Sequence, residues 1–159
     1  MKKIAVFPGS FDPFTRAHQD LVERGLRLFD RIIVAVGANS AKKGLLSVEK
    51  RVEGIRKTFE GYAQVEVESY RGLTVDYCKV KGAGVILRGI RNSQDLIFEQ
   101  AIASNNAELA GDIESVFLMS DKSLSHISST IVRDIWINKG QVSHLVPAAV
   151  LQVLEIESQ

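Results

Sequence analysis

The chain has 159 residues, of which 45% are hydrophobic and 25% are charged, a composition that excludes disordered and fibrous proteins. The formal net charge of +1 argues against a protein that coats DNA or RNA, because binding to a phosphate backbone usually requires a basic excess. No apolar run is long enough for a signal peptide or a membrane span, so we expect a cytoplasmic protein that binds neither nucleic acid nor membranes.

Short apolar runs alternate along the chain with segments of helical spacing. Five runs rich in valine and isoleucine have the length of strands, at residues 3–7, 31–37, 65–69, 84–89 and 114–119. Segments with apolar residues every three or four positions lie near residues 18–29, 47–59, 73–82, 95–109, 128–138 and 147–157. This alternation predicts a single α/β domain over residues 1–159, with a Rossmann-like, doubly wound sheet of five parallel strands and helices on both faces.

Unusual polar loops follow all five predicted strands. They cover residues 8–18, 38–44, 70–74, 88–95 and 120–130. Ligands of such sheets bind beyond the carboxyl ends of the strands, near the point where the strand order reverses. The sequence therefore places a binding site where these five loops meet.

The first loop combines a tight turn with a histidine, in the stretch "FPGSFDPFTRAH" of residues 7–18. The N–H groups at a helix start bind phosphate, with the positive end of the helix dipole behind them. His18 stands where this helical pattern begins, so we predict a chemical role for it. Because it lies at a turn-to-helix junction, we expect its side chain to contribute little to stability.

Two arginines follow the fourth predicted strand. Arg88 and Arg91 bracket Gly89 and are not interleaved with acidic residues. Arginine is suited to bidentate recognition of phosphate, so these two side chains are predicted to bind an anion. Lys43, taken alone, is interpreted as an ordinary surface charge.

A cluster of hydroxyls opens the helical segment near residue 128. Ser128, Ser129 and Thr130 exceed what capping a helix requires, and they could receive a second phosphate group. Of the remaining reactive residue types, Cys78 is predicted to pack in a helix and His144 to lie at the surface, and the role of His126 stays open.

These segments also carry a family resemblance. "GSFDPFTRAH" resembles the G-T/S-F-D-P-x-T-x-G-H signature of nucleotidylyltransferases, and "ISSTIVR" resembles their second nucleotide motif. With "RGIR" between them and "NSAKKG" after the second strand, the chain resembles the bacterial phosphopantetheine adenylyltransferase family. The resemblance extends from the first strand to "GQVSHLVP" near the end, which is essentially the whole chain.

The resemblance implies an enzyme that transfers the adenylyl group of ATP to 4′-phosphopantetheine, with Mg²⁺ as cofactor and a homo-hexamer as the assembly. It implies His18 as the catalytic residue, without a dedicated protein site for the metal. It also implies contacts of the acceptor with Ser10, Lys42, Thr74 and Arg88. The implied contacts of ATP are Ser10, Phe11, His18, Gly89, Ile90, Arg91, Glu99, Leu124, Ser125, His126, Ile127, Ser128, Ser129 and Thr130.

Two alternatives stay open. One is another transferase of the same signature, acting in cytidylyl transfer or on nicotinamide mononucleotide. The other is a non-catalytic nucleotide sensor, suggested by Ala17 where the signature has glycine and by Leu124 where an aromatic residue is common. Departures from the family pattern also occur at Ile97 and Phe98, beside the retained Asp95 and Glu99.

Overall fold

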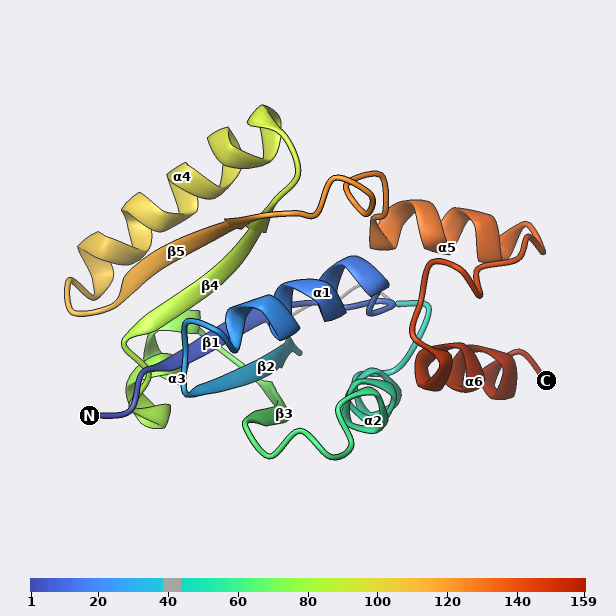
Figure 1. Ribbon diagram of the computed structural model, residues 1–159, viewed down its shortest axis with the longest axis horizontal. Coiled ribbons are helices and arrows are strands. Elements are labelled where there is room, and N and C mark those ends of the chain that lie inside the picture. The colour runs from blue at the N-terminus through green and yellow to red at the C-terminus, as the bar shows by residue number, and fades with distance from the viewer. Residues whose placement is uncertain (39–43) are drawn as a thin grey trace.

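A computed structural model describes residues 1–38 and 44–159, in which strands and helices alternate as in Figure 1. The strands are β1 (Ile4–Gly9), β2 (Arg31–Gly37), β3 (Val65–Tyr70), β4 (Val85–Ile90) and β5 (Glu114–Met119). The helices are α1 (Arg16–Gly25), α2 (Val48–Thr58), α3 (Thr74–Lys81), α4 (Ser93–Leu109), α5 (Ser129–Ile137) and α6 (Ala148–Glu157). All strand pairs are parallel and the order is β3-β2-β1-β4-β5, which confirms the predicted fold class.

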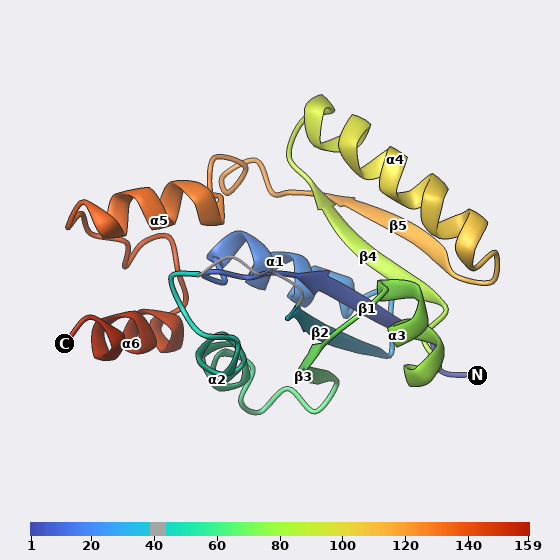
Figure 2. The same cartoon turned by 180° about the vertical axis from the view of Figure 1, so that it is seen from behind.

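The central strands are apolar along most of their length because both faces of the sheet are covered. Val34 of β2 packs in a cluster with Val22 of α1 and Ile55 of α2. Its neighbour Ile33 points to the opposite face and packs with Cys78 of α3. Figure 2 shows α3 on the far side of the sheet from the view in Figure 1, and α4 runs beside β4 and β5 in both views. Among the described residues, no helix is both long and apolar enough to cross a bilayer.

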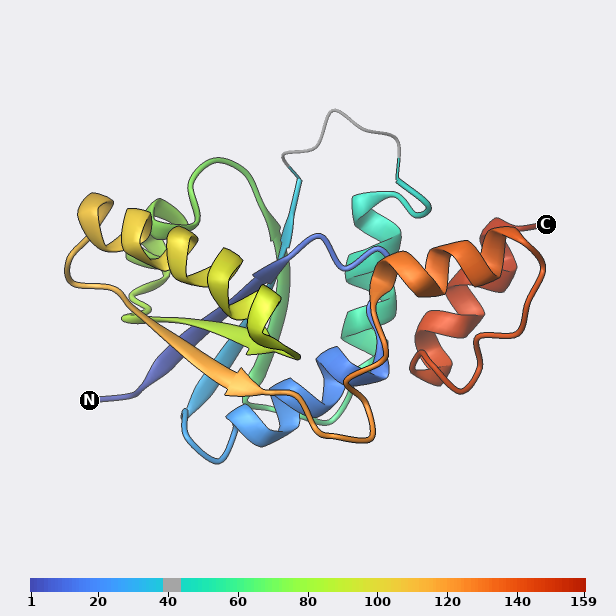
Figure 3. The same cartoon turned by 90° about the horizontal axis from the view of Figure 1, so that it is seen from above.

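Helices α5 and α6 extend the molecule past the carboxyl ends of the strands (Figure 3). The approach to α6 is tied to the start of α1, because the N–H of Arg16 donates to the Leu145 carbonyl at 2.9 Å. The same arginine donates from Nε to the Val146 carbonyl at 3.3 Å. Helix α6 packs on α2, where Val150 and Val153 face Gly54. The loops after β1 and β5 are thereby enclosed by two further helices.

Strand β1 is longer than the sequence pattern indicated. Pro8 and Gly9, expected in the loop, continue the strand and are paired with Ala35 and Val36 of β2. The register of β1 with β4 covers Ala5 and Val6, so the two strands diverge beyond that point. Proline lacks an N–H, which makes Pro8 compatible with a strand whose neighbour has moved away. The opening between β1 and β4 lies where the strand order reverses, which is the expected place for a ligand.

Two helical glycines test how closely the helices pack. A Cβ on Gly25 would lie 2.8 Å from Ile32 Cδ1, whereas a Cβ on Gly54 would meet Val150 Cγ2 at 3.4 Å. We expect Gly25→Ala to lower the free energy of unfolding by about 1–3 kcal/mol through overpacking. Gly54→Ala should preserve that free energy or raise it by up to about 1 kcal/mol, because alanine favours a helix. Urea denaturation of both variants measures the difference, and a Gly25→Ala protein as stable as the parent would contradict the packing of α1.

Candidate active site

Two cavities adjoin at the opening between β1 and β4. The first, of about 320 Å³, extends toward α3 and α4 and is lined by Thr74, Ile102 and Asn106 among others. The second, of about 430 Å³, extends toward the starts of α1 and α5 and is lined by His18 and Arg91 among others. Both cavities include Pro8, Gly9, Ser10, Arg88 and Glu99. A molecule in one cavity and a molecule in the other would therefore meet at these shared residues.

The structure brings together most of the residues singled out from the sequence. The described acceptor residues Ser10, Thr74 and Arg88 all line the first cavity. The nucleotide residues that line the second cavity are Ser10, Phe11, His18, Gly89, Arg91, Glu99, Ile127, Ser128, Ser129 and Thr130. Lys42, the remaining acceptor residue, lies outside the described residues, as does Lys43.

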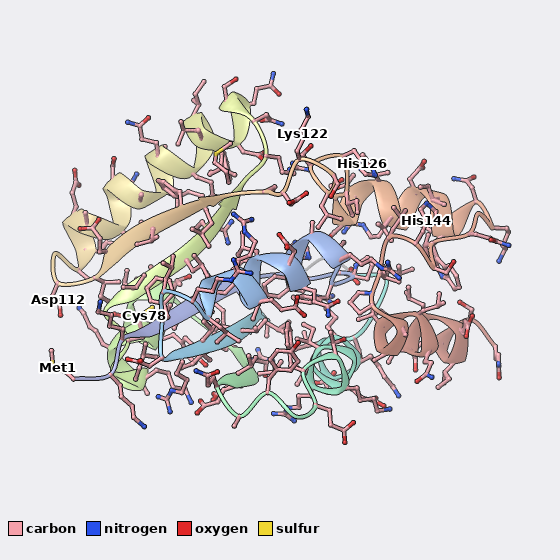
Figure 4. The ribbon with its side chains drawn as sticks, in the orientation of Figure 1. Met1, Cys78, Asp112, Lys122, His126 and His144 are labelled. Carbon is pink, nitrogen blue, oxygen red and sulfur yellow. The ribbon has the colours of Figure 1, made fainter. Side chains whose placement is uncertain are left out.

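Four predicted nucleotide residues do not line either cavity. Ile90 is buried, with only 2% of its surface exposed. Leu124 lines a separate hollow beside α1 and α2, and the hydroxyl of Ser125 donates to the Lys122 carbonyl at 3.2 Å. His126, the fourth of these residues, is exposed on the loop before α5 (Figure 4). His144, for which no contact was predicted, is exposed on the loop before α6, as expected. Contact of these four residues with a nucleotide would require a part of the ligand outside the second cavity.

His18 is fixed by the residue that begins its own helix. Thr15 caps α1, and its buried N–H donates to His18 Nδ1 at 3.0 Å. The Thr15 hydroxyl in turn lies 3.4 Å from the His18 N–H, which completes a capping box. The imidazole also packs against the rings of Phe11 and Phe14, at centroid distances of 5.1 and 5.2 Å. The ring satisfies a buried donor and packs among aromatic side chains, so the premise behind the expected small effect of His18 on stability is wrong, and we expect a variant that loses both contacts to be destabilised.

These contacts determine which nitrogen of His18 carries the proton. Nδ1 accepts the backbone N–H of Thr15, so the neutral ring carries its proton on Nε2. Burial, and then the positive charges of Arg88 and Arg91, lower the pKa of His18 from 6.5 to about 3. In the ligand-free protein at neutral pH, His18 is thus an uncharged hydrogen-bond donor.

This lowered pKa makes stability depend on pH. In the unfolded chain His18 becomes protonated below about pH 6.5, whereas in the folded protein it stays neutral down to about pH 3. The stability that neutral His18 contributes is therefore lost as the pH falls from 6.5 to about 3. We expect His18→Asn, whose side-chain oxygen can still accept the Thr15 N–H, to lose less stability than the parent between about pH 7 and about pH 4. Denaturation curves across this range measure the slope, and equal slopes would show that the pKa of His18 is the same in both states.

Arg88 and Arg91 are both paired with carboxylates of α4, although no acidic residue stands between them in the sequence. Arg88 Nε donates to Glu99 Oε2 at 2.9 Å, and its two Nη atoms donate to Glu99 Oε1 and to the Pro8 carbonyl. Arg91 Nε and Nη2 donate to the two carboxylate oxygens of Asp95, at 2.9 and 3.1 Å. Asp95 and Glu99 are four residues apart and share a helix face, which the sequence alone could have shown.

The pair formed by Arg88 and Glu99 holds the arginine in a defined orientation. Glu99 has only 7% of its surface exposed, and Arg88 lies within β4 rather than in the loop after it. Among the described residues, Glu99 and Pro8 engage three of the five N–H donors of the guanidinium, which leaves two for a ligand. The fixed fork suits a planar contact with a phosphate or carboxylate.

The hydroxyl cluster divides into three separate roles. Ser128 caps α5 by accepting the Ile131 N–H at 3.2 Å. Ser129 donates to the Pro13 carbonyl at 2.8 Å and so connects α5 to the loop after β1. The Thr130 hydroxyl accepts from Arg133 at 3.3 Å. What faces the second cavity is therefore the start of helix α5, with the anion-attracting end of its dipole.

Three contributors to the site were missed by the sequence reasoning. Thr15 precedes His18 by three residues, which is capping-box spacing with histidine in place of glutamate, so a signal was present. Tyr70, at the end of β3, lines the first cavity and its hydroxyl lies 2.8 Å from that of Thr74. Asn106 lines the same cavity from the last turn of α4, where a polar residue gives no signal of its own.

The charged residues of the two cavities do not form a metal site. Among residues 1–38 and 44–159, no three side chains of His, Cys, Asp or Glu are grouped so that they could hold a metal ion. The two carboxylates at the second cavity, Asp95 and Glu99, are bound to arginines. Cys78 is buried in α3, and burial raises the pKa of its thiol to about 11, which fits the packing role predicted for it.

Comparison with known proteins defines the class of this site. The family model described as Cytidylyltransferase-like matches residues 6–135, which include every described residue that lines the second cavity. A solved structure described as that of a nicotinate-nucleotide adenylyltransferase from Vibrio parahaemolyticus has a TM-score of 0.75 over 99% of this chain and 94% of its own. At 20% identity, that likeness is one of fold.

Curated relatives narrow the class to one family. A phosphopantetheine adenylyltransferase from Christiangramia forsetii is 51% identical over 94% of this chain and 98% of its own length. One from Leptospira biflexa is 49% identical over 97% of this chain and 96% of its own. The chain belongs to the phosphopantetheine adenylyltransferase family.

Proposed function

We propose that this protein transfers the adenylyl group of ATP to 4′-phosphopantetheine, forming dephospho-coenzyme A and pyrophosphate. The observation that carries the proposal is the pair of adjoining cavities that share Ser10 and Arg88. Two anionic substrates, one in each cavity, can bring a phosphate and the α-phosphate of a nucleotide together at these residues. The names of the relatives supply the identity of the two substrates.

The chemistry requires no general base on the protein. The phosphate monoester of the acceptor is already anionic near neutral pH, so it can attack the α-phosphate directly while pyrophosphate leaves. The protein then contributes by positioning the two substrates and by stabilising negative charge on the α-phosphate oxygens. This division of work agrees with a site that contains arginines and a neutral histidine.

His18 is the donor we assign to the α-phosphate. Its Nε2–H is free to donate, since Nδ1 is held by Thr15. The hydrogen bond from a neutral donor is moderate in the ground state, and it becomes stronger as negative charge develops on the α-phosphate in the transition state. Arg88 holds the acceptor phosphate, and the start of α5 with Arg91 holds the remaining phosphates of ATP.

We propose that Mg²⁺ enters the site as its complex with ATP. The described side chains offer no cage for it, and Mg²⁺ commonly retains waters and binds through substrate phosphates. When bound, it would neutralise charge on the phosphate oxygens.

A substrate panel tests the proposed function. The purified protein is incubated with Mg²⁺, one nucleotide and one acceptor, and products are identified by mass spectrometry. We expect dephospho-coenzyme A only with ATP and 4′-phosphopantetheine together, and none when a chelator removes Mg²⁺. Equal turnover with CTP, or with nicotinamide mononucleotide as the acceptor, would favour another transferase, and ATP binding without any product would favour a sensor.

We also propose the homo-hexamer that the resemblance implies, with α4 at an interface between subunits. Support comes from its apolar side chains, since Ile97 and Phe98 are 70% and 66% exposed. We expect Ile97→Asp combined with Phe98→Asp to give a smaller species in light scattering. Val80→Asp is the control, because Val80 is 82% exposed but lies on α3. An unchanged mass for the α4 variant would contradict this interface.

Two further assignments remain proposals. We propose that residues 1–159 act as one nucleotidylyltransferase domain, supported by the packing of α6, outside the matched residues 6–135, against α2. We propose a cytoplasmic location, which agrees with a single cysteine and hence no intramolecular disulfide.

A further inference from the structure

A buried ion pair lies next to the site without lining either cavity. Asp12 and Arg51 are 5% and 6% exposed, and Arg51 Nε lies 3.5 Å from Asp12 Oδ1. Among the described residues, the other buried polar or charged side chains are Thr15 and Glu99, which hold His18 and Arg88 respectively. The role of the remaining pair can be read from its contacts.

Asp12 connects its own loop to the segment before α2. Its two carboxylate oxygens accept the N–H groups of Leu45 and Leu46, at 2.8 and 2.9 Å. Its backbone carbonyl accepts from Arg133 of α5 at 2.7 Å. Asp12 is thus bonded both to the chain that leads into α2 and to the helix whose start borders the second cavity.

Arg51 reaches Ser10, one of the residues that both cavities share. From α2, its Nε donates to the Leu46 carbonyl at 2.9 Å and its Nη1 donates to the Ser10 carbonyl at 3.2 Å. Gly44 lies directly over this pair, because a Cβ there would collide with the Arg51 guanidinium and lie 2.6 Å from Asp12 Oδ2. The side chains of the pair make four hydrogen bonds with the backbone, and a shift of the Ser10 carbonyl away from Arg51 would break one of them.

The loop held in this way has a conformation that requires support. Phe11, between Ser10 and Asp12, has φ of +48°, in the left-handed region that a non-glycine residue rarely adopts. Such a conformation persists when the surrounding structure determines it. Both neighbours of Phe11 are fixed by the ion pair, and its ring is fixed against Phe7 and Phe14.

Stability alone is a weak reason for such a pair, since a buried ion pair can often be replaced by apolar residues without loss. We propose that Arg51, anchored by Asp12, is a positioning residue that holds Ser10 in place at the junction of the two substrates. This inference rests on the proposed function, because its effect is expressed in the transfer between those substrates. Neither residue touches a cavity, so Arg51 acts through Ser10.

The test separates positioning from stability by comparing two arginines of α2. Arg51→Lys retains the charge beside Asp12 but loses the fork that reaches Leu46 and Ser10 together. Arg56→Lys is the control, because Arg56 Nε donates to the Val67 carbonyl at 3.0 Å and Arg56 lines neither substrate cavity. Measurements are the melting temperature, the Kd of ATP by calorimetry, and kcat per folded protein.

We expect Arg51→Lys to lower kcat by about 10- to 100-fold, because small misplacements of reacting groups have effects of that size. The Kd of ATP should change less than about threefold, and Arg56→Lys should retain the parental kcat. Parental kcat in folded Arg51→Lys would overturn the inference. If Arg51→Lys does not fold, Arg51→Gln is measured in its place. If neither variant folds, the ion pair serves stability, and the positioning role of Arg51 is overturned. Absence of turnover in the parent would instead refute the proposed function.

Discussion

His18→Asn should fold, with a melting temperature somewhat lowered by the loss of ring packing, and lose about 100- to 1,000-fold in kcat, the size of effect seen when one oxyanion donor is removed. The side-chain oxygen of asparagine can accept the Thr15 N–H in place of Nδ1, so the capping box survives. The donor that Nε2 supplied is lost, and its loss should appear in kcat rather than in the Kd of ATP.

His18→Gln is the complementary variant. The amide nitrogen of glutamine can take the place of Nε2, but no acceptor remains for the buried N–H of Thr15. We expect kcat to exceed that of His18→Asn while the free energy of unfolding falls by about 1–3 kcal/mol, the effect of an unsatisfied buried donor. Near-parental kcat in folded His18→Asn would contradict the catalytic role of His18.

Arg88→Lys should lower kcat/KM for 4′-phosphopantetheine by about 10- to 150-fold, which corresponds to the loss of a charge-assisted hydrogen bond of about 1.5–3 kcal/mol. A lysine retains the charge beside the buried Glu99 but cannot bind Glu99, Pro8 and a phosphate together. The Kd of ATP should change less, because Arg91 remains in the second cavity. Steady-state kinetics and calorimetry measure the two effects.

Arg31→Lys provides the matched control for Arg88→Lys. Arg31 forms an ion pair with Glu66 at 2.9 Å, but this pair joins β2 to β3 at a partly exposed position away from both cavities. Its kinetics should equal those of the parent. If Arg88→Lys matched the control in kcat/KM, the acceptor phosphate would have to be bound elsewhere.

The fold could be predicted because central strands that are buried on both faces appear in the sequence as short, continuous runs of apolar residues. Residues 31–37 form the buried strand β2 with the expected bounds. Residues 114–119 also form a strand with the expected bounds, although β5 lies at the edge of the sheet and is only half-buried. The extent of β1 could not be predicted, since Pro8 and Gly9 normally end a strand. Their place in β1 depends on the divergence of β4, which is a property of the assembled sheet.

The site was predictable where a residue acts through its place in the chain. His18 and the start of α5 were identified because they follow strands at one edge of the sheet, and Arg88 because it lies near the end of a strand that leads to the same edge. What escaped prediction depends on partners from distant segments. Arg88 is oriented by Glu99 of α4, and Arg51 reaches Ser10 across 41 residues of sequence. The second role of His18, its hydrogen bond to the backbone of Thr15, is local, and the capping-box spacing of the two residues gave a signal for it that was missed.

A single-turnover reaction with labelled ATP tests the proposed transfer most directly. The protein is mixed with 4′-phosphopantetheine, Mg²⁺ and ATP that carries phosphorus label at either the α or the γ position. We expect α-label to appear in dephospho-coenzyme A and γ-label in pyrophosphate, in equal amounts and at the same rate. Release of γ-label as inorganic phosphate, or no transfer of α-label to the acceptor by the folded protein, would contradict attack at the α-phosphate in this site.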